Sequence, residues 1–119
     1  MKSVVFEAPG RVTVEDRPEP AIEAPGDAIV RVTMTAVCGS DLLPYTGRRP
    51  RQAGTSMGHE VCGVVTAVAD GVTRVKPGDR VVSPFSIACG GCFYCKQGLL
   101  SACETRQIYG LELPGAQAE

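Results

Sequence analysis

Four cysteines lie close together in the C-terminal third of the sequence, in the pattern C-x2-C-x2-C-x7-C: Cys89, Cys92, Cys95 and Cys103. Glycines interrupt this segment, so the chain can bend enough to bring the four sulfur atoms together. Four thiolates about 2.3 Å from a common centre are the usual ligands of a structural Zn²⁺ ion. Because the protein supplies all four ligands of such a tetrahedron, no position remains for a substrate. The pattern therefore predicts a structural zinc site, and any chemistry must lie elsewhere.

Six cysteines are also an even number, so disulfide bonds and a redox function have to be weighed against zinc. The segment Met1–Arg11 lacks the apolar core of a signal peptide, which favours a cytoplasmic location where thiols stay reduced. Neighbouring Cys-x-x-Cys pairs are also awkwardly placed for mutual bridges. Zinc is the favoured interpretation, and a redox pair formed by Cys89 and Cys92 is the alternative.

A second group of potential metal ligands combines Cys38 with His59, which is the only histidine. Cys38 follows one expected strand and His59 precedes another, so both can reach the rim of a barrel. The carboxylates of Asp41 and Glu60 can orient the imidazole or occupy a metal position themselves. Residue statistics alone favour a buried cysteine and a hydrogen-bonded histidine over a metal site.

The composition describes one small domain of short strands and many turns, with 14 glycines and nine prolines among 119 residues. The formal charge of −1 and the absence of a long apolar run suggest neither a nucleic acid nor a membrane as partner. The mainly β pattern predicts a small barrel with a metal-held lobe at 89–103. Strands are expected at Ser3–Phe6, Val12–Glu15, Ala28–Ala36, Val61–Val68 and Arg80–Ser83, and one short helix at Ser40–Tyr45.

Three further positions receive structural interpretations. Gly63, inside the strand Val61–Val68, indicates a bulge or a close backbone contact. Cys62 in the same strand is interpreted as a small core residue. The basic cluster of Arg48, Arg49 and Arg51 is interpreted as a solvated loop, with an anion site as the less favoured alternative.

Several motifs together resemble the zinc-dependent medium-chain alcohol dehydrogenases. They are Gly58-His59-Glu60, the sequence VTRVKPGDRV at 72–81 and the four-cysteine segment. The sequences CGSDL at 38–42 and SPF at 83–85 are similar to the branch of threonine, sorbitol and formaldehyde dehydrogenases. The resemblance covers residues 1–119 and does not specify the substrate. It implies a mainly β, GroES-like, partly open β-barrel with a structural zinc lobe at 89–103.

The resemblance also implies a role for individual residues. Cys38 and His59 correspond to ligands of a catalytic zinc, and Glu60 to an acidic neighbour that can become a ligand. Asp41 corresponds to the partner of the histidine, and Ser40 to the hydroxyl that relays the substrate proton. In such enzymes zinc acts as a Lewis acid on the oxygen of a small alcohol or carbonyl substrate, and hydride is exchanged with NAD or NADP.

The sequence departs from this family in four respects. Leu43 occupies the position of a histidine that completes the proton relay in some relatives, and Gly39 that of an arginine near the cofactor pyrophosphate. A Rossmann domain with its glycine-rich turn is absent from residues 1–119, and the third catalytic zinc ligand is expected outside them. We therefore expect the zinc-bearing portion of an oxidoreductase, inactive by itself and able to form a homo-oligomer. The alternative is a non-enzymatic zinc module with a structural or interaction role.

Overall fold

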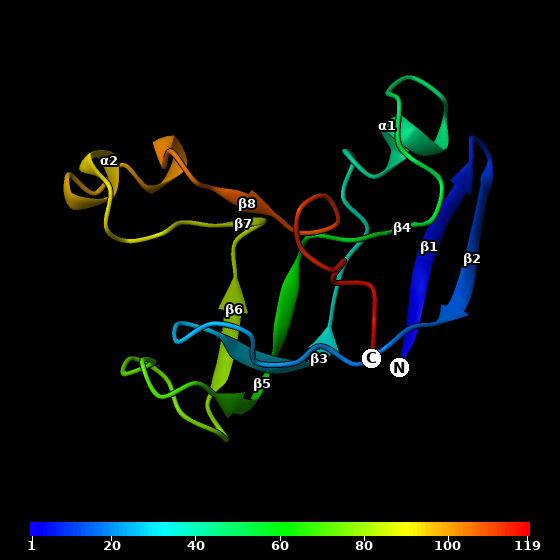
Figure 1. Ribbon diagram of the computed structural model, residues 1–119. Helices are drawn as coiled ribbons and strands as arrows, with labels where there is room; N and C mark the ends of the chain where they lie inside the picture. Colours follow the sequence, from blue (N-terminus) through cyan, green and yellow to red (C-terminus); the bar gives the residue numbers. More distant parts are fainter.

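The computed structural model describes residues 1–119, which form three small sheets joined by long loops (Figure 1). All strand pairs within these sheets are antiparallel, so the chain contains no parallel βαβ unit of the Rossmann type. None of the helices has the length and apolar character needed to cross a membrane. The elements in chain order are β1 (Lys2–Ala8), β2 (Arg11–Asp16), β3 (Ala28–Met34), α1 (Leu42–Tyr45), β4 (Thr55–Ser56), β5 (Val61–Val68), β6 (Arg80–Ser83), β7 (Ser86–Ile87), α2 (Phe93–Lys96), the 3₁₀ turn η1 (Leu100–Ala102) and β8 (Gln107–Ile108).

The first sheet has the strand order β2-β1-β4 and supplies much of the small core. The expected hairpin is confirmed, because β1 and β2 pair along their length and turn at Gly10, whose φ of 76° suits a residue without a Cβ. Val5 and Phe6 of β1 are 0% and 2% exposed, whereas Val14 of β2 is 66% exposed. The sheet therefore buries its central strand and leaves β2 as a solvated edge.

The second sheet has the order β3-β5-β6 and lies beside the first in Figure 1. The expected bounds of β5 and β6 are confirmed, whereas β3 ends at Met34, before the expected end at Ala36. The chain turns away after Met34, and the Thr35 hydroxyl then donates to the carbonyl of Glu60 at 2.8 Å. The close contact expected at Gly63 is also confirmed, since a Cβ there would overlap the carbonyl oxygen of Arg31 in β3.

The last residues of the chain link the two ends of the structure. The Val4 N–H donates to the Gln117 carbonyl, and the Gln117 N–H donates to the Met57 carbonyl. The segment 116–119 therefore lies between β1 and the loop before His59, and the two termini are neighbours in Figure 1. Within this segment Ala118 forms an isolated antiparallel bridge with Ser3.

Gly115 makes this closure possible, because a Cβ at this position would overlap the backbone of Met57. We expect Gly115→Ala to lower the free energy of unfolding by about 2–4 kcal/mol, as overpacking against backbone cannot be relieved by a side-chain rotation. Urea unfolding followed by circular dichroism measures the effect. Gly26→Ala is the matched control, since a methyl group added there would meet nothing within 4 Å; equal stability of both variants would contradict the prediction.

The core is small for a chain of this length, with 14 of 119 residues buried. Val5, Phe6, Met57, Val65 and Ala116 form its apolar part. Because a small core contributes little stability, we expect other interactions, such as bound metal, to stabilise the fold.

Candidate metal centres

The lobe at 89–103 brings the four predicted cysteine ligands together. Their sulfur atoms all lie within 4.8 Å of one another. The Sγ atoms of Cys89 and Cys103 are 3.6 Å apart, and those of Cys89 and Cys95 are 4.0 Å apart. A tetrahedron with arms of about 2.3 Å has edges of about 3.8 Å, whereas a disulfide needs about 2.05 Å. The four side chains therefore fit a tetrahedral zinc ion, and all six cysteines are free thiols.

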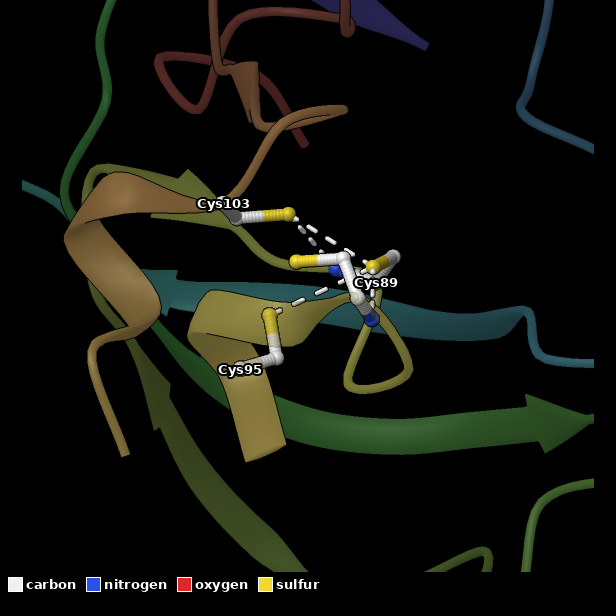
Figure 2. A group of neighbouring side chains, drawn as sticks. Cys89, Cys95 and Cys103 are labelled. Carbon is white, nitrogen blue, oxygen red and sulfur yellow. Dashed lines mark hydrogen bonds between the residues drawn. The ribbon is translucent and has the colours of Figure 1, made fainter. Parts of the chain in front are cut away.

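Short local structures aim these thiols at a common point. Strands β7 and β8 form the stem of the lobe, and Cys89 follows β7 on a glycine turn. Cys92 precedes α2, Cys95 lies inside it, and Cys103 follows η1. Figure 2 shows the sulfur atoms of Cys89, Cys95 and Cys103 pointing toward one another from these separate segments. None of β7, α2 or β8 was expected from the sequence, since each is too short to show a hydrophobic period.

The lobe has no hydrophobic core of its own. Between 89 and 106 the only buried residues are Cys95 and Cys103, each 8% exposed. The large apolar side chains of the segment face outward, with Phe93 at 67% and Leu99 at 54% exposed. Because apolar burial is too small to order this segment, we infer that a metal ion holds the four thiols together and gives the lobe its shape.

The thiol environments differ within the cluster. Backbone N–H groups of Gly91 and Cys92 donate to Cys89 Sγ and lower the pKa of this thiol to about 6. Burial, together with a hydrogen bond shared with Cys92, raises the pKa of Cys95 to about 12. The backbone N–H of Cys89 lowers the pKa of Cys103. Since zinc binds thiolates, its binding must displace the proton from Cys95.

The second group of ligands also converges. Candidate ligand atoms of Cys38, His59 and Glu60 lie within 4.8 Å of one another. The mixed thiolate, imidazole and carboxylate set suits Zn²⁺, and three protein ligands leave a fourth position open. Hydrogen bonds from the Ser40 side chain and backbone, and then from His59, hold the pKa of the Cys38 thiol below its usual value. These three side chains could therefore hold a second zinc ion, and their assignment as its ligands remains a prediction.

The carboxylate of Asp41 contacts both the histidine and the cysteine of this second group. Its side chain is 4% exposed, and Oδ1 lies 3.3 Å from His59 Nδ1. The other carboxylate oxygen accepts the Cys38 N–H at 2.9 Å. Because Asp41 occupies Nδ1, Nε2 is the candidate ligand atom of His59, and it forms a 3.2 Å hydrogen bond with Ser40 Oγ. One carboxylate thus contacts both candidate ligands, whereas the resemblance implied a contact with the histidine alone.

We expect Asp41→Asn to weaken zinc binding at the second group by about 10- to 100-fold, because the amide cannot match the carboxylate that orients the imidazole. Competition with a chromogenic chelator measures this affinity. Asp27→Asn is the control, since Asp27 also accepts backbone N–H bonds, from Glu23 and Ala24, but lies in a turn remote in sequence from the ligands. An unchanged affinity in Asp41→Asn would contradict this role.

Both Cys38 and His59 line a large cleft, which has a volume of about 1030 Å³. Two sequence interpretations need correction here. Cys62 lines this cleft and is only partly buried, because β5 begins at the cleft and exposes its first residues. Arg51 is only partly solvated, because its guanidinium donates to the carbonyls of Ser56 and Gly110.

Sequence reasoning missed several further cleft residues. Phe85 and Tyr109 line the cleft, and the Tyr109 hydroxyl lies 3.2 Å from Ser83 Oγ. They approach the ligand group only through the pairing of β7 with β8 and the contact of Tyr109 N–H with the Phe85 carbonyl. No sequence motif indicated a role for Tyr109. Ser83 and Phe85 belong to the SPF sequence at 83–85, which was one of the motifs that resembled the family.

The fold and the two ligand groups define a class of protein. A mainly β, partly open domain with a closed four-thiolate site and a separate Cys-His-Glu group in a cleft is the zinc-bearing domain of dehydrogenases. More specifically, the chain belongs to the alcohol dehydrogenase GroES-like domain family, whose model matches residues 24–119.

Individual relatives agree with this family. Zinc-type alcohol dehydrogenase B of Aspergillus flavus is 52% identical over the whole chain, which covers 28% of that relative. The solved alcohol dehydrogenase of Thermus sp. ATN1 is 45% identical with a TM-score of 0.95, over the whole chain and 36% of that protein. An Escherichia coli alcohol dehydrogenase solved with NADH is 31% identical with a TM-score of 0.80, over 99% of this chain and 34% of that one. The chain thus spans about a third of the length of these relatives.

Proposed function

We propose that this chain is the zinc-bearing catalytic portion of an oxidoreductase that interconverts small alcohols and carbonyl compounds with NAD or NADP. The convergence of Cys38, His59 and Glu60 in a large cleft, with Ser40 beside the imidazole, carries the proposal. Relatives that are named alcohol dehydrogenases support it. Since the chain covers only part of their length, we assign the activity to the chain together with a nucleotide-binding domain.

The residues of the chain have distinct tasks in this proposal. Cys38, His59 and Glu60 hold zinc, which when bound supplies Lewis-acid polarisation of the substrate oxygen and lowers the pKa of an alcohol. Asp41 keeps His59 in the tautomer that presents Nε2 to the metal. The Ser40 hydroxyl would relay the substrate proton, accepting it while donating its own proton to water in the cleft, since the Leu43 side chain has no group that could accept it.

We further propose a cytoplasmic location and self-association. Free thiols in a zinc site persist in a reducing compartment, and all six cysteines are free. Strand β3 pairs on one side only, so its other edge can pair with a second copy. We expect sedimentation velocity to show concentration-dependent dimers of the chain; a strict monomer at high concentration would exclude edge pairing.

A non-enzymatic zinc module is the second candidate, favoured by the small core and by a lobe with only two buried residues, both cysteines. A redox pair at Cys89 and Cys92 is less well supported, because the sulfur spacing fits a shared metal ion. Zinc content and free-thiol titration before and after chelation separate these two candidates, since a redox pair needs no zinc.

The deciding experiment compares the 119-residue chain with the protein expressed from its complete coding sequence. After mild chelation we expect the isolated chain to keep about one zinc, in the four-thiolate site, because three ligands form a weaker cage than four. We expect alcohol-dependent reduction of NAD or NADP by the complete protein and none by the isolated chain. Lack of turnover by the complete, zinc-loaded protein with a broad alcohol panel would favour the non-enzymatic module.

A further inference from the structure

The three arginines of the loop after α1 have different environments. Arg51 has a structural role, because its Nη2 donates to the Ser56 carbonyl at 2.6 Å and its Nε donates to Thr55 Oγ1 at 2.9 Å. Arg48 is exposed and does not line the cleft. Arg49 is also exposed, but it lines the same cleft as Cys38 and His59. Arg49 is therefore the one arginine of the cluster that lines the cleft and makes no side-chain hydrogen bond or ion pair.

The position of Arg49 is set by its backbone. The N–H groups of Arg48 and Arg49 both donate to the carbonyl of Leu43, at 2.9 and 3.2 Å. Pro50 follows directly and restricts the backbone before it to extended conformations. Because Leu43 belongs to α1, which begins just after Ser40 and Asp41, the loop is tied to the segment that carries the ligand group. These bonds fix the backbone of Arg49 at the cleft wall, where its exposed side chain is accessible to a ligand.

No protein group neutralises Arg49. Its guanidinium takes part in none of the ion pairs or side-chain hydrogen bonds of the structure. The carboxylates of the cleft are engaged elsewhere: Asp41 with His59, Glu112 with the Ile108 N–H, and Glu60 with the ligand group. Burial lowers the pKa of Arg51, the carboxylate of Asp41 raises it, and the positive charge of Arg49 lowers it. Arg49 is therefore a cation in the cleft wall that has no ion-pair partner in the protein.

We infer that Arg49 is a specificity residue that binds an anionic group, a carboxylate or a phosphate, on the substrate. The inference rests on the proposed function, since it needs the alcohol or carbonyl carbon to react at the Cys38–His59 group. A guanidinium offers two parallel N–H donors that match the oxygens of either anion. Arg49 would bind the charged end of the substrate, and the hydroxyl-bearing carbon of the substrate would lie beside Cys38 and His59.

The test measures kcat/KM of the complete, zinc-loaded protein for matched pairs of alcohols that differ in charge. Secondary butanol is paired with hydroxybutanoate, and glycerol with glycerol phosphate, so that the two arms separate carboxylate from phosphate. We expect the wild type to prefer the anionic member of at least one pair. Arg49→Gln should lower the anionic-to-neutral ratio about 10- to 100-fold, mainly through KM, because a charge-assisted hydrogen bond is lost.

Two variants make the result specific. Arg49→Lys should recover part of the ratio because it keeps the charge, and Arg48→Gln should leave the ratio unchanged because Arg48 lies outside the cleft. An unchanged ratio in Arg49→Gln, or an equal loss in Arg48→Gln, would overturn the inference. A raised KM for NAD or NADP with an unchanged substrate ratio would also overturn it, by assigning Arg49 to the nucleotide phosphates. Turnover of neutral alcohols without any anionic preference refutes this inference alone, whereas no turnover in either series refutes the proposed function as well.

Discussion

Cys103→Ser is expected to remove one zinc ion per chain and to unfold the lobe between β7 and β8. The hydroxyl of serine is a poor zinc ligand, and the lobe buries only Cys95 and Cys103. A structural zinc ion contributes an apparent free energy of about 10–16 kcal/mol in small zinc domains. Losing even about 3 kcal/mol should lower Tm by more than about 10 °C. Metal analysis and hydrogen exchange of the lobe measure the two effects.

Cys62→Ser is the matched control for this experiment. It makes the same chemical change at a thiol outside the four-cysteine cluster, so zinc content and lobe protection should stay at the wild-type level. If Cys103→Ser retained its zinc and its protected lobe amides, the four-thiolate centre would have to be abandoned.

His59→Ala is expected to lower kcat/KM of the complete protein by at least about 10³-fold. The substitution removes one of three candidate ligands and the hydrogen-bond partners of Ser40 and Asp41. A loss of this size corresponds to about 4 kcal/mol of transition-state stabilisation, within the several kcal/mol that a metal ion supplies. Steady-state kinetics with a saturating nucleotide give the value.

Gln52→Ala serves as the comparison for His59→Ala, since Gln52 lines the same cleft and is not among the ligand residues. It should change kcat/KM by only a few fold. The four-thiolate zinc should remain in both variants, which separates loss of the reaction centre from loss of the fold. Near-normal turnover by His59→Ala would mean that catalysis does not depend on this histidine.

The ligand groups were accessible from the sequence because they depend on residue type and short spacing. The four cysteines lie within one loop, so their convergence needs no long-range pairing. The Cys38 and His59 pair was weaker from the residues alone, because it depends on strands β3 and β5 meeting in the right register. The resemblance to zinc-dependent alcohol dehydrogenases implied that Cys38 and His59 lie together before the register of these strands was known.

Long-range contacts account for what the sequence could not predict. The apolar residues of β5 and β6 predict these two strands from the sequence. In contrast, β4, β7 and β8 have two residues each, and only their pairing with other strands defines them. Arg51 looked like part of a solvated loop because its acceptors, such as the Gly110 carbonyl, are distant in sequence. Tyr109 reaches the cleft for the same reason.

Gly58 couples the reaction centre to the far end of the chain. Its φ of 88° and the contact its Cβ would make with Gln117 leave room only for hydrogen at this position. Its carbonyl also accepts the Ala116 N–H at 3.0 Å, one residue before the His59 ligand. Only one peptide bond separates this carbonyl from His59, so a displacement of the closing segment should be transmitted to the imidazole.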